Sequence, residues 1–105
     1  MTSTHAFKMQ LKPGVAEEYR RRHDAIWPEL AALLKAVGIG DYSIYLDPPS
    51  GALFAVQQLA EGERTAELPS HPVMRRWWSY MADLMETNPD GSPRVTRLTR
   101  VFYLE

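Results

Sequence analysis

Residues 17–34, EEYRRRHDAIWPELAALL, place aromatic and aliphatic side chains at helical spacing. Tyr19, His23 and Trp27 recur every four residues, so on a helix they lie along one stripe, with Ile26 and Leu30 beside it. A helix with a purely structural role would carry aliphatic side chains there. This stripe carries a phenol, an imidazole and an indole instead, which makes His23 a candidate for a chemical role. The alternative is that His23 is a boundary residue of the core that only hydrogen-bonds a neighbour.

Pro28 interrupts the same stretch. It lacks a backbone N–H, and its ring clashes with the carbonyl oxygen four residues earlier. We therefore expect the helix to kink or restart between Asp24 and Trp27. His23 would then lie beside an irregularity of the backbone.

The composition predicts a single domain over residues 1–105 with no dominant charge. The chain has 12 Lys and Arg against 13 Asp and Glu, a net charge of -1, so the positive surface expected of a nucleic-acid-binding protein is missing. It has no cysteine, which excludes disulfides and thiolate chemistry. The N-terminus shows no signal-peptide pattern, and no apolar run is long enough to span a membrane. We expect a cytoplasmic protein that binds neither nucleic acid nor membranes.

Alternating and helical patterns divide the rest of the chain. Alternation of apolar and polar residues, with turn formers at 47–51, predicts strands at 5–11, 41–47, 52–59 and 95–104, the second and third joined as a hairpin. Ser70 is expected to cap a second helix that has Pro72 in its first turn and apolar residues at helical spacing up to Met85. Residues 61–68 fit either a short helix or a charged connection.

The order strand, helix, strand, strand, helix, strand is that of an α+β, ferredoxin-like βαββαβ subunit. In this arrangement two helices cover one face of a four-stranded antiparallel sheet. The other face carries both polar and aromatic residues, among them Lys8, Ser43 and Tyr45. Such a mixed face is expected if two sheets meet across a homodimer around an internal pocket.

Several kinds of site leave no pattern in the chain. His5, His23 and His71 lie on separate elements, and no two have the spacing of a zinc motif, although a site assembled in three dimensions stays open. There is no glycine-rich phosphate loop and no serine-nucleophile elbow, because Ser70 is better explained as a cap. Enzymes that catalyse phosphoryl transfer, acyl transfer or most redox reactions are therefore not among the leading candidates for the function.

Trp77 and Trp78 are adjacent in the second helix. Neighbouring residues of a helix point about 100° apart, so the two indoles cannot share one core position. Either both belong to the core in different places, or one offers a flat apolar wall that suits the C–H face of a sugar ring.

Six segments together resemble the L-rhamnose mutarotase family over residues 6–104: AFKMQLKPG, EEYRRRHDAIWPEL, DYSIYLD, RRWWSYM, MADLMETNPDGSP and VFYL. The resemblance implies a dimeric α/β barrel of ferredoxin-like subunits that interconverts the α and β anomers of L-rhamnopyranose. It also implies that His23 is the catalytic acid and that the sugar contacts Tyr19, Tyr42, Trp77 and Trp78.

Two positions depart from the family pattern. Asp24-Ala25 stands where the family often has Asn-Pro, and Thr65 stands where it often has a tryptophan. A negative charge on Asp24 would raise the pKa of His23 if the two side chains approach. Either departure could tune the substrate range, but neither removes a residue matched to a role.

Anomer interconversion suits the side chains that the chain possesses. It needs one proton delivered to the ring oxygen and one removed from the anomeric hydroxyl, and general acid–base catalysis contributes about 10²–10⁴-fold to such transfers without metal or cofactor. We predict that His23 carries the proton to and from the pyranose oxygen, because imidazole donates and accepts near neutral pH. Tyr19 would help to orient the ring.

Two other classes of function stay open at this point. One is another dimeric α/β-barrel enzyme, such as a small monooxygenase or a haem-degrading protein in which His23 binds iron. The other is a sugar-binding effector module without catalytic activity. The patterns identify neither the second acid or base beside His23 nor the selectivity among related sugars.

Overall fold

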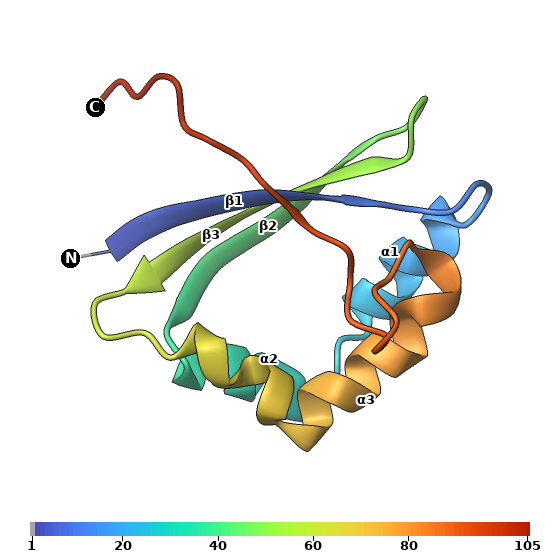
Figure 1. The fold of residues 1–105 in the computed structure, drawn as a ribbon, viewed down its shortest axis with the longest axis horizontal. Helices are drawn as coiled ribbons and strands as arrows, with labels where there is room; N and C mark the ends of the chain where they lie inside the picture. The colour runs from blue at the N-terminus through green and yellow to red at the C-terminus, as the bar shows by residue number, and fades with distance from the viewer. Residues whose placement is uncertain (1) are drawn as a thin grey trace.

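The computed structural model describes residues 2–105 as an antiparallel sheet with helices on one face (Figure 1). The strands are β1 (Thr2–Gln10), β2 (Ile39–Asp47), β3 (Ala52–Ala60) and β4 (Thr96–Arg97), in the order β2-β3-β1-β4. The helices are α1 (Ala16–Asp24), α2 (Pro28–Ala36) and α3 (Pro72–Met81), with the 3-10 helices η1 (Thr65–Ser70) and η2 (Ala82–Leu84) on either side of α3. This strand order and the one-sided helices confirm the predicted α+β, ferredoxin-like fold.

The break at Pro28 is confirmed. Trp27 is extended, with φ -62° and ψ 129°, as expected of a residue before proline, and Pro28 takes the first position of α2. The N–H of Ile26 donates to the carbonyl oxygen of His23 over 3.1 Å. α1 therefore ends in a tight turn immediately after His23, and α2 leaves in a new direction.

The hydrophobic core lies between the sheet and the helices. β1 and β3 alternate so that Phe7, Met9, Leu53 and Ala55 face the helices, each with at most 9% of its surface exposed. The helices contribute Tyr19, Leu30, Met74, Trp77 and Met81 to the same cluster. Across residues 2–105, no helix combines the length and apolar composition needed to cross a membrane.

The start and end of the second predicted helix need correction. His71, not Ser70, occupies the N-cap position of α3, because Ser70 ends η1 and its Oγ donates to the carbonyl oxygen of Glu67 over 2.6 Å. The undecided stretch 61–68 therefore becomes a turn followed by the start of η1. Met85 lies beyond the helices in an extended conformation and forms a β-bridge with Leu11.

The last predicted strand is mostly absent. Only Thr96 and Arg97 pair with β1, and Leu98 adds one hydrogen bond to the carbonyl oxygen of Ala6. Residues 99–105 then leave the sheet on the side away from the helices (Figure 1). Alternation and β-propensity are local signals, and they make a strand only where a neighbouring strand accepts the hydrogen bonds. We call residues 99–105 the C-terminal arm.

Candidate active site

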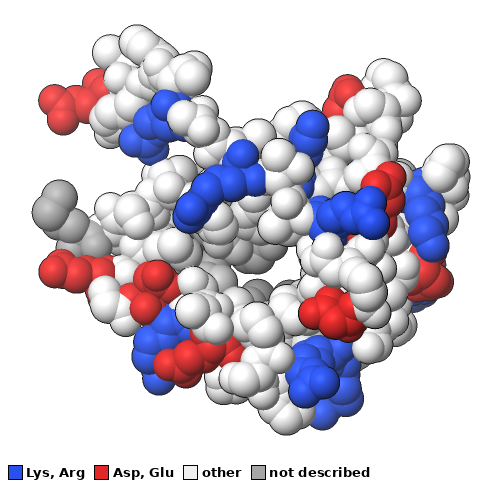
Figure 2. Space-filling view, in the orientation of Figure 1, with Lys and Arg blue, Asp and Glu red and all other residues white. Residues whose placement is uncertain are grey.

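A cavity of about 1230 Å³ lies between the helices and the sheet. In the space-filling view a hollow opens there, bordered mainly by uncharged atoms (Figure 2). The sequence suggested an internal pocket between the sheets of two subunits. That pocket stays a prediction, and the cavity that holds His23 lies on the other face of the sheet, which the helices cover, within a single chain.

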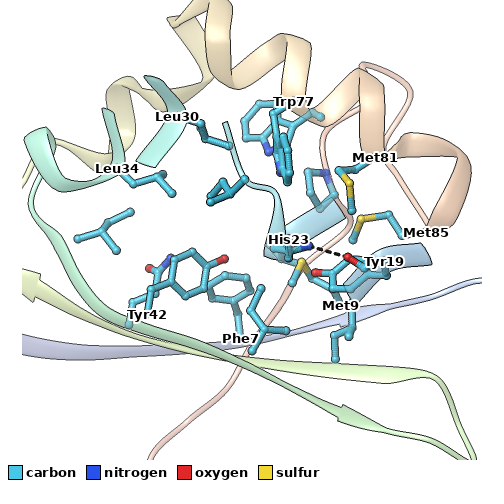
Figure 3. Close-up of a pocket in the computed structure, with 18 of the residues that line it drawn as sticks. Phe7, Met9, Tyr19, His23, Leu30, Leu34, Tyr42, Trp77, Met81 and Met85 are labelled. Atoms are coloured by element: carbon cyan, nitrogen blue, oxygen red, sulfur yellow. Dashed lines mark hydrogen bonds between the residues drawn. The ribbon is translucent and has the colours of Figure 1, made fainter. Parts of the chain in front are cut away.

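The family resemblance gave a role to five residues, and all five line this cavity. Tyr19 and His23 come from α1, Tyr42 from β2, and Trp77 and Trp78 from α3. The close-up shows the first four converging on the same space (Figure 3). Three elements that are distant in the sequence thus supply a single site.

His23 is held in one orientation. Its Nδ1 lies 3.1 Å from the carbonyl oxygen of Tyr19 (Figure 3), and because a carbonyl only accepts, Nδ1 carries the proton. The imidazole packs on the ring of Tyr19, with centroids 4.3 Å apart, and forms a T-shaped pair with the indole of Trp77, with centroids 5.4 Å apart and ring planes at 88°. In the neutral ring Nε2 therefore holds the lone pair that can accept a proton.

Burial decides the charge of this imidazole. Removal from water lowers the pKa of His23 below its ordinary value. The hydrogen bond to Tyr19 and the charge of Asp24 act in the opposite direction but are weaker. Asp24 thus raises the pKa of His23, as expected, but burial lowers this pKa by more. His23 is therefore neutral near pH 7.

The two tryptophans occupy different environments. Trp77 is 6% exposed, belongs to the core, and packs edge-on against Trp27 with centroids 5.1 Å apart. Trp78 is only partly buried and packs at the border of the core. Both line the cavity, so Trp77 joins the core to His23, while Trp78 supplies the more open wall.

A β-bulge turns Tyr42 toward the cavity. Gly40 pairs with Gln58 and Ser43 with Val56, so Asp41 and Tyr42 together oppose the single residue Gln57. Asp41 absorbs the irregularity with a positive φ of 45°, a conformation that aspartate tolerates better than most residues. The extra residue shifts the alternation, and Ile39 and Tyr42, which would face opposite sides of a regular strand, both line the cavity.

Both tyrosines of the site stay protonated. Burial raises the pKa of Tyr19, and interaction with Tyr42 raises it further. Burial also raises the pKa of Tyr42 to about 12, although a hydrogen bond from Gln57 works against the rise. Their hydroxyl groups can therefore donate hydrogen bonds at neutral pH. Tyr42 is nevertheless 38% exposed, since its surface faces the open cavity.

A sequence model of the L-rhamnose mutarotase family matches residues 4–104. The chain belongs to the L-rhamnose mutarotase family. An L-rhamnose mutarotase of Sinorhizobium fredii is 59% identical over 100 residues, which are 95% of this chain and 96% of that protein. The crystal structure of an L-rhamnose mutarotase from Formosa agariphila superimposes with a TM-score of 0.92 at 43% identity, covering 98% of this chain and 99% of that one. A solved structure from Pseudomonas aeruginosa, 18% identical over 94% of this chain and 93% of its own with a TM-score of 0.57, shares the fold alone.

Gln57 is the residue of this mutarotase-family site that the sequence reading missed. It is the only buried polar residue among residues 2–105, at 6% exposure, and it lines the cavity opposite the bulge. A weak signal was present, because Gln57-Gln58 interrupts the otherwise apolar strand ALFAVQQLA. No group of three or more His, Cys, Asp or Glu that could hold a metal ion occurs within residues 2–105.

Proposed function

We propose that this protein interconverts the α and β anomers of L-rhamnopyranose in the cavity between the helices and the sheet. The observation that carries the proposal is the fixed, neutral imidazole of His23, placed among Tyr19, Tyr42 and Trp77 in a cavity large enough for a sugar. Membership of the family, whose relatives are named for this activity, supports the same reaction.

Apolar groups and hydrogen-bonding groups of the cavity bind different parts of the sugar. The indoles of Trp77 and Trp78 offer flat surfaces to the C–H face of a pyranose. Methionines of β1, of α3 and of the segment after η2 add apolar wall, among them Met9, Met81 and Met85. The hydroxyl groups of Tyr19 and Tyr42 bond the sugar oxygens. This pairing suits a 6-deoxy sugar, which has a methyl group as well as hydroxyls.

His23 exchanges the proton at Nε2. Because the resting imidazole is neutral, it first accepts a proton, and in the cyclic sugar the anomeric hydroxyl is the group that must lose one. The ring C–O bond then opens to the aldehyde, while a tyrosine hydroxyl donates to the ring oxygen on which charge develops. After rotation about C1–C2, the imidazolium returns its proton to the carbonyl oxygen as the ring closes on the other face. The neutral ground state thus favours the anomeric hydroxyl over the pyranose oxygen as the partner of His23.

Proton NMR of L-rhamnose tests the proposal. Saturating the anomeric signal of one anomer should reduce the signal of the other in proportion to the rate of exchange, and catalytic amounts of the protein should increase that transfer well above its value in buffer. Transfer that stays at the buffer rate, with binding of the sugar still detected, would leave a sugar-binding module in place of the enzyme.

A homodimer is part of the same proposal. The sheet face opposite the helices exposes Tyr45 at 63% and Phe54 at 36%, and the C-terminal arm exposes Val101 at 93% and Phe102 at 76%. Large apolar side chains exposed in such number are typical of an interface. A second copy of the chain fits it, because the arm carries unpaired backbone groups and strand-forming side chains beside the open sheet face. The cytoplasmic location expected from the sequence stays a prediction.

A further inference from the structure

A row of polar side chains crosses three strands on the cavity side of the sheet. Gln57 of β3 pairs directly with His5 of β1, and on its other side it faces the bulge that carries Tyr42 of β2. The next pair along the same face of β1 and β3, Phe7 and Ala55, belongs to the apolar core. A buried amide in such surroundings is costly unless both of its ends are bonded.

The first link of the row is the hydrogen bond between His5 and Gln57. Nδ1 of His5 lies 3.2 Å from Oε1 of Gln57, and because an amide oxygen only accepts, the imidazole donates. The ring of His5 also packs against Phe7, with centroids 5.1 Å apart. These two contacts fix which end of the Gln57 amide faces β1 and leave its NH₂ group facing β2.

The second link joins Gln57 to Tyr42 across the bulge. Because Oε1 of Gln57 accepts from His5, the NH₂ group is the end of the amide that can donate to the Tyr42 phenol, and the effect of Gln57 on the pKa of Tyr42, a lowering, agrees with this direction. One lone pair of the phenol oxygen is then occupied. Within residues 2–105, no other group bonds this hydroxyl, so its proton is left for an acceptor in the cavity.

We propose that Gln57, oriented by His5, is a positioning residue that fixes the Tyr42 hydroxyl as a hydrogen-bond donor to the sugar. The inference rests on the proposed function, because the acceptor is an oxygen of L-rhamnose. It explains why the buried face of β3, which carries Leu53 and Ala55, has a glutamine at position 57. It also separates the roles of the polar residues, since Tyr42 touches the sugar and Gln57 and His5 act through it.

A double-mutant cycle tests the inference. Gln57→Met preserves the length of the side chain and removes both hydrogen bonds, Tyr42→Phe removes only the hydroxyl, and Gln58→Met is the matched control on the opposite face of β3, where Gln58 bonds Thr2 and Thr4. We expect Gln57→Met to lower both L-rhamnose affinity and the catalysed exchange rate by up to about tenfold, the size of one hydrogen bond. Gln58→Met should leave both unchanged. The double variant Gln57→Met/Tyr42→Phe should match Tyr42→Phe alone.

Losses that multiply in the double variant would overturn the inference, because Gln57 would then act independently of Tyr42. His5→Phe keeps the ring packing of His5 and removes the hydrogen-bond donor to Gln57. If Gln57→Met fails to fold, His5→Phe takes its place in the double-mutant cycle with Tyr42→Phe. A readout without sugar separates this inference from the proposed function. The side-chain amide signal of Gln57 in the free protein should shift in Tyr42→Phe and in His5→Phe. An unmoved signal would contradict the positioning role whatever the activity.

Discussion

At the scale of single residues, His23 combines a fixed tautomer with a lowered pKa. Its Nδ1–H is bound to the carbonyl oxygen of Tyr19, so proton exchange is confined to Nε2. Burial penalises the imidazolium, and the pKa lies below the ordinary histidine value. The same packing that orients the ring therefore keeps it neutral and ready to accept a proton.

The pH dependence of catalysis follows from the direction of this pKa shift. In the proposed mechanism neutral His23 is the active form, so the rate, after subtraction of the buffer rate, should be constant above pH ~6.5 and fall only as the pH drops through the lowered pKa. Saturation transfer measured between about pH 5 and 8 gives the profile. A midpoint at or above 6.5, or a rate that grows as the pH falls, would contradict the neutral resting form.

The two tryptophans should respond differently to truncation. Trp77→Ala removes a core indole that touches His23 and Trp27, so unfolding in denaturant should show a loss of ~3–5 kcal/mol. Trp78→Ala should cost less stability and should mainly weaken L-rhamnose binding in an NMR titration. Equal stability losses together with unchanged affinity in both variants would remove the tryptophans from the sugar site.

At the scale of the elements, Arg22 joins α1 to the end of α3. Its guanidinium donates to Glu18 over 2.7 Å, to Asp83 over 2.9 Å and to the carbonyl oxygen of Tyr80 over 2.7 Å, and its side chain is only 12% exposed. It also lies 4.5 Å from the centre of the Tyr80 ring. Arg22, which does not line the cavity, therefore adds to the core packing that holds α1, with His23, against α3, with Trp77.

Removing this bridge should loosen the site. Arg22→Met should lower the free energy of unfolding by about 1–3 kcal/mol, since several charge-assisted hydrogen bonds are lost. Arg21→Met is the control, because Arg21 is exposed and, among the described residues 2–105, its side chain bonds Glu18 alone, and it should cost under about 1 kcal/mol. Arg22 also holds the pKa of Asp83 below its usual range, so the part of the stability that this ion pair contributes should be present above pH ~4 and decrease as the pH falls through the lowered pKa. Denaturant titrations at several pH values should show less of this decline in Arg22→Met, and equal costs for the two variants would contradict the account.

The elements that local chemistry specifies were predictable from the sequence. Pro28 divided α1 from α2 because its missing N–H and its ring act on their immediate neighbours. The hairpin followed from alternation around a Pro-Pro-Ser-Gly turn. The helical stripe placed Tyr19 and His23 on one side of α1, and the family resemblance added Tyr42, Trp77 and Trp78, which share the cavity.

What depends on contacts between distant segments was not predictable. The bulge at Asp41 and Tyr42 is set by the pairing with β3, and Gln57 gains its place only from strands on both sides. Ser70 resembled a cap, but the turn of η1 uses its hydroxyl. Val95 and the residues after it have the pattern of a strand, whereas the single chain offers a neighbour only to Thr96 and Arg97.

At the scale of the whole molecule, the proposal of a homodimer rests on the C-terminal arm and the open sheet face. We expect the full chain to sediment at micromolar concentration with twice the mass of a 12.0 kDa monomer. Phe102→Asp puts a charge into the apolar arm and should shift this equilibrium toward the monomer, while Glu105→Ala at the end of the arm should not. A full-length protein that sediments only as a 12.0 kDa species would contradict the homodimer.

The variant His23→Asn tests the central claim, that His23 carries the proton of anomer exchange, most directly. Asparagine has a similar volume and retains some hydrogen bonding, but it cannot cycle a proton. Saturation transfer between the anomeric protons of L-rhamnose should show exchange near the buffer rate in the variant, while circular dichroism and sugar titration show that it still folds and binds. Retention of most of the catalysed rate would contradict the account and move the proton transfer to Tyr19, Tyr42 or an acidic residue.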